Sequence, residues 1–130
     1  MKKPVWIREI EALAFHSQQI AIFGGSDGLR DRGLLDSALA RPKNLLAYAE
    51  NPLTMPDLAA AYAIGISSNH PFVDGNKRTA MQVAFVFLEY NGFKITASQE
   101  DAYLTFLSVA AGEISEAELA EWFTDHTSAQ

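Results

Sequence analysis

The segment from His70 to Arg78, with the sequence HPFVDGNKR, concentrates side chains that can bind phosphate and move a proton. Histidine is a common general base in proteins, so His70 can take a proton from an attacking hydroxyl. Asp74 offers a hard oxygen ligand, which suits a magnesium ion that also contacts phosphate. Lys77 supplies a point charge, and the guanidinium of Arg78 can bind two phosphate oxygens at once. A base, a magnesium carboxylate and a cationic anion site are the parts that a phosphoryl-type transfer requires.

The backbone of this segment is suited to the same task. Pro71 stops the preceding helix, and Gly75 permits backbone angles that other residues avoid. The next helix is predicted to begin near Asn76, and a helix N-terminus offers free N–H groups and partial positive charge to an anion. Glycine just before it lets a phosphate approach the backbone, while Phe72, the large apolar residue of the segment, is expected to anchor the loop in the core.

Each of these residues also has a simpler explanation. A single histidine is more often structural than catalytic, Asp-Gly is usually a turn, and Asn76 could serve only as a helix cap. The prediction of a phosphate-transfer site rests on the occurrence of all these residues together in the segment 70–78. Two other site types are excluded, because no Walker sequence G-x-x-x-x-G-K-[ST] is present and no cysteine or closely spaced histidine pair could hold zinc.

Helical spacing of apolar residues dominates the chain, and no repeat or linker interrupts it. We predict an all-α protein of six to seven helices around a central buried helix. That helix is expected over residues 76–91, since its apolar residues face almost every direction around the axis. The other helices are predicted over about 6–23, 31–40, 45–48 and 55–69, with two more starting at Ser98 and Ser115.

Several local signals fix these bounds. Trp6, Ile10, Leu13 and Ile20 would form the buried face of the first helix, and Pro42 is expected to break or bend the second. The helix that starts at Ser98 would carry Leu104, Leu107 and Ala111 inward. Ser115 with Glu118 forms a capping box for the last helix. Residues 93–96 are predicted to be briefly extended, and the tail, 124–130, is expected to fray.

The composition fits a single domain over residues 1–130. The net charge is −6, and residues 96–130 contain seven acids and no Lys or Arg, a surface that repels nucleic acid. No apolar stretch is long enough for a membrane helix, and the charged start is not followed by the apolar run of a signal peptide. With no cysteine in the sequence, we expect a cytoplasmic protein that contacts neither nucleic acid nor a membrane directly.

The segment 70–78 resembles the Fic/Doc signature H-P-F-x-[DE]-G-N-[GK]-R. A second stretch, residues 23–42, together with His16 before Gly24-Gly25, is similar to the N-terminal region of the death-on-curing branch. The likeness runs from about residue 10 to residue 125. It implies a Fic/Doc-type helical bundle in which His70 is the general base, Asp74 the magnesium ligand, and Asn76, Lys77 and Arg78, with the backbone at Gly75, the phosphate binders.

Two positions distinguish the branches of this family. Nucleotidyl-transferring Fic enzymes have a second glycine where Lys77 stands and a second arginine where Met81 stands. Lysine at position 77 is typical of the death-on-curing branch, and this resemblance implies a kinase that transfers the γ-phosphate of ATP to a hydroxyl of elongation factor Tu and so blocks translation. A death-on-curing toxin has alanine where Gly75 stands, so nucleotidyl transfer stays an alternative, as does a catalytically idle regulatory domain.

The resemblance also implies a toxin–antitoxin module. Residues 96–100 match the first five positions of the family's inhibitory helix, [ST]-x-x-x-E-[GN], but Asp101 follows, and Ser98 with its neighbouring acids is interpreted as a helix start. Inhibition would then come from an antitoxin with a disordered segment that folds on binding. His16 is predicted to be structural. Arg30 and Asp31 are expected either to form an ion pair at a helix start or to line the surface that docks the target.

Overall fold

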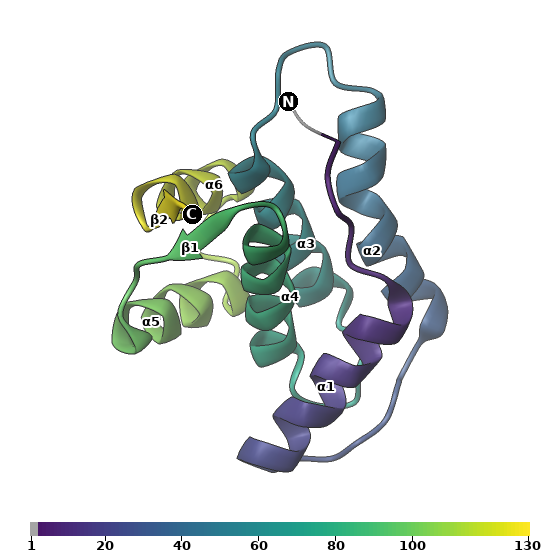
Figure 1. The fold of residues 1–130 in the computed structure, drawn as a ribbon. Helices are drawn as coiled ribbons and strands as arrows, with labels where there is room; N and C mark the ends of the chain where they lie inside the picture. Colours follow the sequence, from purple (N-terminus) through teal and green to yellow (C-terminus); the bar gives the residue numbers. More distant parts are fainter. Residues whose placement is uncertain (1–2) are drawn as a thin grey trace.

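The computed structural model describes residues 3–130, in which six helices surround one core and two short strands form a small sheet. Met1 and Lys2, the first residues of the segment considered above as a signal peptide, lie outside the described residues. The prediction of a helical bundle is confirmed, with the sheet as an addition (Figure 1). In chain order the elements are α1 (Glu9–Phe23), α2 (Arg32–Ala47), α3 (Met55–Asn69), α4 (Asn76–Tyr90), β1 (Phe93–Ile95), α5 (Gln99–Ala110), α6 (Glu116–Asp125) and β2 (Thr127–Ala129).

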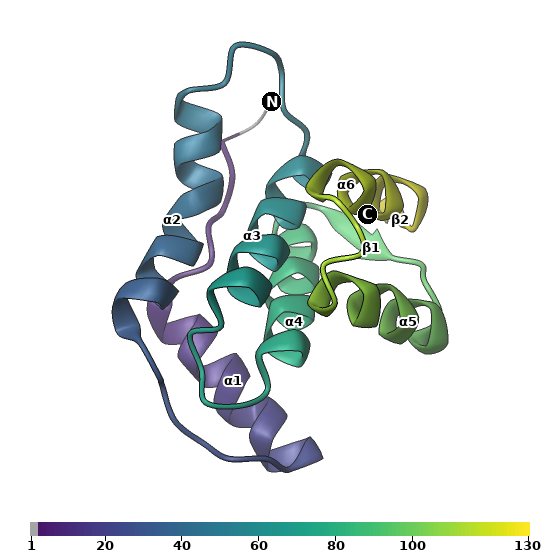
Figure 2. The same cartoon turned by 180° about the vertical axis from the view of Figure 1, so that it is seen from behind.

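Two central helices, α3 and α4, share the middle of the bundle. Figures 1 and 2 show them between α1 and α2 on one side and α5 and α6 on the other. The prediction placed residues 76–91 at the centre, but α3 is the more enclosed, with ten of its fifteen residues buried against seven in α4. Its small side chains explain this, because the run from Ala59 to Ala61 lets neighbouring helices approach closely.

The predicted starts of α3, α5 and α6 agree with the structure, whereas α1 begins at Glu9 and not near residue 6. Thr54 and Asp57 form a capping box at α3, and Ser115 and Glu118 form another at α6. Ser98 caps α5 by accepting a hydrogen bond from the N–H of Asp101. Residues 96–98 are therefore a loop, and residues 99 and 100 begin α5, as the helix-start interpretation required.

Three details of the helices were predicted wrongly. Helix α2 continues through Pro42, which is buried inside it, so residues 45–48 are not a separate helix. In α1 the side chain of Ile10 is exposed, while Ile7, just before the helix, is buried in its place. In α5 the buried residues are Ala102, Phe106 and Val109, whereas Leu104 and Leu107 are exposed. Apolar spacing alone does not decide which of two overlapping faces a short helix buries.

The tail, expected to fray, is instead paired. Strand β2 runs antiparallel to β1, with Lys94 opposite Ser128. The N–H of Thr96 donates to the carbonyl of His126, and the N–H of Gln130 donates to the carbonyl of Gly92. The tail has few apolar side chains, so its order comes from backbone hydrogen bonds that the sequence pattern does not reveal.

A cluster of aromatic rings joins α4, α5 and α6. Phe85, Phe106, Trp122 and Phe123 lie with neighbouring ring centroids 5.4 to 6.5 Å apart. Phe106 and Phe123 are essentially inaccessible to solvent. None of the helices described is both long enough and apolar enough to cross a membrane.

Candidate active site

The connection between α3 and α4 gathers the predicted residues around one cavity. All six of them line a hollow of about 210 Å³ that opens to solvent: His70, Asp74, Gly75, Asn76, Lys77 and Arg78. Both ends of the connection have left-handed backbone. Gly75 precedes α4 with φ 77°, and His70 ends α3 with φ 52° and ψ 54°. For a residue with a side chain, this conformation costs about 1–2 kcal/mol, so contacts around His70 must hold it there.

The start of α4 provides free donors to the cavity. Within residues 3–130, no protein acceptor receives a hydrogen bond from the backbone N–H of Asn76, Lys77 or Arg78. Helix N–H groups without partners attract an anion, and here two cationic side chains stand beside them. The arrangement is an anion site in which the backbone and side chains act together.

The side chain of Asn76 is already engaged by hydrogen bonds within the protein. Its Oδ1 accepts the N–H of Phe72 at 2.9 Å and its Nδ2 donates to the carbonyl of Phe72 at 2.9 Å, which fixes the amide's orientation. The same Nδ2 lies 3.1 Å from Nδ1 of His70. With the side chain buried and engaged, only the backbone N–H of Asn76 remains for a phosphate. The amide instead orients the histidine, and Nδ1, as the acceptor, leaves the hydrogen of a neutral ring on Nε2.

The carboxylate of Asp74 is held from two sides. Its Oδ1 accepts the N–H of Gly75 at 2.8 Å, and its Oδ2 accepts the N–H of Ser26 at 3.2 Å. These two bonds, with a smaller contribution from the nearby Arg78 charge, keep the pKa of Asp74 below its ordinary value. The group is therefore ionised at neutral pH, and each oxygen keeps a lone pair free.

A magnesium ion would fit these residues. Magnesium keeps several waters and takes one or two carboxylates together with substrate phosphates. No group of three acidic, histidine or cysteine side chains in the described part of the chain forms a complete metal cage. A single oriented carboxylate could therefore supply one ligand to such an ion, with the remaining ligands coming from water and phosphate.

Beneath the loop, His16 supports the segment from below. Its ring is 3% exposed and stacks on Phe72 with the ring centroids 3.8 Å apart. Its Nε2 donates to the backbone carbonyl of Asp74 at 2.8 Å. The structural role predicted for His16 and the anchoring role predicted for Phe72 are both confirmed. The two stacked rings hold the loop at residues 72–74 in place against the core.

Two aromatic residues that sequence reasoning missed hold the cationic side chains. The ammonium of Lys77 lies 5.0 Å from the ring centroid of Tyr103, and the guanidinium of Arg78 lies 4.8 Å from that of Phe23. Both pairs line a second, mostly apolar cavity of about 210 Å³. Phe23 ends α1 next to Gly24-Gly25, but no sequence signal relates it to residue 78, because only the fold brings them together.

Arg30 and Asp31 do not form the predicted ion pair with each other. Asp31 caps α2, accepting the N–H of Leu34 at 2.9 Å. Arg30 turns the other way, and its guanidinium donates to the backbone carbonyls of Asn69 and His70.

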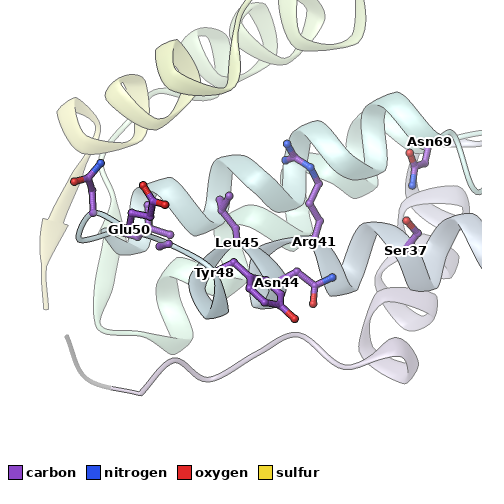
Figure 3. Close-up of a pocket in the computed structure, with 10 residues that line it drawn as sticks. Ser37, Arg41, Asn44, Leu45, Tyr48, Glu50 and Asn69 are labelled. Atoms are coloured by element: carbon purple, nitrogen blue, oxygen red, sulfur yellow. The ribbon is translucent and has the colours of Figure 1, made fainter.

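The largest cavity lies apart from these groups. It has a volume of about 700 Å³ and runs along α2 toward the end of α3 (Figure 3). Asn69 is the one lining residue next to the candidate site, and its amide is engaged by the carbonyl of Leu34. Arg41, the cation of this cavity, is paired with Glu116. The lining contains no base beside an anion site, so its size alone does not make it the reactive centre.

Comparison with known proteins identifies the family of this chain. A family model described as the Fic/DOC family matches residues 6–88, which include α1 to α3, the whole segment 70–78 and all but the last two residues of α4. Over 111 residues the chain is 35% identical to the protein kinase doc of Escherichia phage P1, covering 85% of this chain and 86% of that one. It is 44% identical over 75 residues to the toxin Doc of Mycolicibacterium smegmatis, covering 58% of each. The chain belongs to the Fic/DOC family, in its death-on-curing branch.

Proposed function

We propose that this protein is a toxin that acts as a protein kinase, transferring the γ-phosphate of ATP to a hydroxyl of elongation factor Tu. The observation that carries the proposal is the single solvent-open cavity where His70, Asp74, Lys77 and Arg78 meet the free N–H groups of α4. The names of the two relatives, a protein kinase and a toxin, support the kinase and toxin parts. The choice of elongation factor Tu rests on the resemblance to the branch.

In the proposed reaction the hydroxyl oxygen of the target forms a bond to the γ-phosphorus, and the bond from that phosphorus to the bridging oxygen breaks. ADP leaves with the electron pair. The proton of the hydroxyl passes to Nε2 of His70, which is exposed beside the cavity. Asn76 holds Nδ1 as an acceptor in the resting ring. The ring hydrogen must therefore first move from Nε2 to Nδ1, which breaks the contact with Asn76 and leaves Nε2 free to accept the proton. Lys77, Arg78 and the N–H groups of α4 stabilise the charge that spreads over the phosphoryl oxygens.

Asp74 would hold the magnesium ion that accompanies ATP, and that ion would neutralise phosphate charge. The protein's own contribution is the direction of the carboxylate, set by the N–H groups of Gly75 and Ser26. Because these bonds lower the pKa of Asp74, a proton does not compete for the site at neutral pH.

The preference for the terminal phosphate rests on Lys77. A lysine side chain takes up space that a glycine at this position would leave open. In the structure its ammonium lies over Tyr103, at the border of the two neighbouring cavities. Selection would therefore act through charge, since the terminal phosphate is the most charged and most accessible part of the nucleotide and can reach Lys77 and Arg78 first.

We further propose that an antitoxin segment, disordered when free, covers this region. Beside the two cationic residues, the side chains of Phe23 and Tyr103 remain 59% and 54% exposed. Exposed aromatic rings next to a reactive cavity suit an amphipathic helix that folds on binding. Such a helix would block access to Lys77 and Arg78 without any change in the fold.

The test uses purified protein, elongation factor Tu and ATP labelled separately at the α- and γ-phosphates. The expected result is label on the target from γ-labelled ATP alone, with a mass gain of about one phosphoryl group. His70→Asn is the matched inactive variant, because asparagine tolerates left-handed backbone and lacks the imidazole. It should lose activity on the order of 10²-fold or more.

Other results would replace the proposal. Label from the α-phosphate would identify the protein as a nucleotidyltransferase. Absence of label from both nucleotides, with elongation factor Tu and with a cell extract, would leave the idle regulatory domain. Equal labelling by the wild type and a folded His70→Asn variant would remove His70 from the mechanism.

A further inference from the structure

Arg30 makes a two-point contact with the end of α3. Its Nε donates to the carbonyl of His70 at 2.8 Å, and one terminal nitrogen donates to the carbonyl of Asn69 at 3.0 Å. The last carbonyls of a helix have no partner within it and carry partial negative charge. A guanidinium presents its N–H groups in a rigid fork, so it can satisfy two neighbouring carbonyls in one fixed geometry.

The backbone on either side of Arg30 fixes where that fork lies. The N–H groups of Arg30 and Asp31 both donate to the carbonyl of Pro71, at 2.7 and 3.0 Å. One step further, the N–H of Val73 donates to the carbonyl of Gly28, at 3.0 Å. The loop between α1 and α2, residues 24–31, is therefore bound along the segment that contains the candidate base.

His70 needs such a restraint. It is the one residue other than glycine with positive φ among residues 3–130. Its side chain is exposed, so packing in the core does not fix its conformation. Asn76 contacts the ring, but the carbonyl of His70 is held by Arg30. If that carbonyl were released, the peptide could relax toward ordinary backbone angles, and the imidazole would turn with it.

We propose that Arg30 is a positioning residue, whose guanidinium holds the backbone of His70 in the left-handed conformation and so directs the imidazole into the cavity. The inference rests on the proposed function insofar as His70 is the base, but the conformational claim can be tested on the free protein. Arg30 does not itself line the cavity of the candidate site.

The alternative is that Arg30 acts through its charge alone, by attracting the nucleotide or the target. The two roles respond differently to Arg30→Lys. Lysine keeps the charge, but its compact ammonium lacks the planar fork and cannot bridge the carbonyls of Asn69 and His70 in the same fixed geometry. A role through charge would survive this exchange, whereas a role through the fork would largely be lost.

The experiment compares Arg30→Ala and Arg30→Lys with Arg32→Ala as a matched control. Arg32 lies two residues away, carries the same charge and pairs on the surface with Glu9. Backbone chemical shifts and the HN–Hα coupling of His70, measured by NMR on the free full-length protein, report its φ. Steady-state kinetics with elongation factor Tu and ATP, and thermal melting, are measured on the same samples.

For both Arg30 variants we expect His70 shifts and couplings that move away from left-handed values. We also expect a kcat lower on the order of 10- to 100-fold, with the KM for ATP nearly unchanged. Arg32→Ala should leave both readouts at wild-type values. Left-handed His70 in Arg30→Ala, or full kcat in Arg30→Lys, would overturn the proposal. If the wild type transfers no phosphate, the proposed function fails, and the NMR comparison alone still decides whether Arg30 positions His70.

Discussion

The two ends of α4 are stabilised in different ways. At its start, Gly75 and Asn76 are fixed by backbone angles and hydrogen bonds around a solvent-open cavity. Toward its end, Phe85 packs with the rings of α5 and α6, and the stabilising contacts are apolar. Helix α4 thus connects a cavity stabilised by hydrogen bonds at its start to a cluster of packed aromatic rings toward its end.

Because of this difference, substitutions at the two ends of α4 are expected to have different effects. A packed aromatic cluster responds to the loss of volume, and the cost falls on the free energy of unfolding. A polar cavity responds to displacements of a fraction of an ångström, and the cost falls on catalysis. Substitutions at the two ends should therefore change different measured quantities, and the three predictions below test that separation.

The largest effect is expected at the packed end. Phe123→Ala removes a fully buried ring from the aromatic cluster and should lower the free energy of unfolding by about 3–5 kcal/mol. Denaturant unfolding followed by circular dichroism measures this. At a temperature where the variant is still folded, its kcat should equal that of the wild type, and a large drop in kcat would show that the two ends are coupled.

The second effect belongs to the start of α4. Arg78→Ala should lower kcat on the order of 10²- to 10³-fold, because a donor to the developing phosphate charge is lost. The free energy of unfolding should change only by about 0.5–1 kcal/mol, the value of an exposed cation–π contact such as that with Phe23. Lys94→Ala, which removes an exposed charge from β1, is the control for net charge. Equal loss of activity in both variants would mean that charge in general, and not position, matters.

The smallest effect concerns the orientation of Asp74. A Cβ on Gly25 would lie 2.6 Å from Oδ2 of Asp74, while a Cβ on Gly24 would meet nothing within 4 Å. Both glycines have positive φ, so Gly24→Ala carries similar backbone strain without the clash. Gly25→Ala should raise the magnesium concentration needed for half-maximal activity by about tenfold. Binding of Mn²⁺ to the nucleotide complex, followed by electron paramagnetic resonance, should weaken in parallel. A similar shift in both variants would assign the effect to loop strain.

The sequence predicted those features that depend on local patterns. The caps of α3, α5 and α6, the break at Pro71 and the anchor Phe72 all follow from residue types at short spacing. The path of α2 through Pro42 could not be predicted in this way, because tertiary packing outweighs the hydrogen bond that proline removes.

The candidate site shows the same division. The residues that would react lie within nine positions of each other and could be found in the sequence. The groups that hold them come from a distance: Ser26 acts through its backbone N–H, and Phe23 and Tyr103 act from other helices. A backbone donor has no residue preference, so no pattern in the sequence indicates which loop will supply it.

The residues near the two ends of the described chain lie close to the C-terminal end of α4. The side chain of Asn91 bonds both the N–H and the carbonyl of Val5, while the N–H of Gln130 donates to the carbonyl of Gly92. In Figure 1 the C-terminus lies away from the loop between α3 and α4. A fluorophore or affinity handle attached at Gln130 would therefore leave the candidate cavity uncovered, so that binding can be followed on tethered molecules without obstructing the site under study.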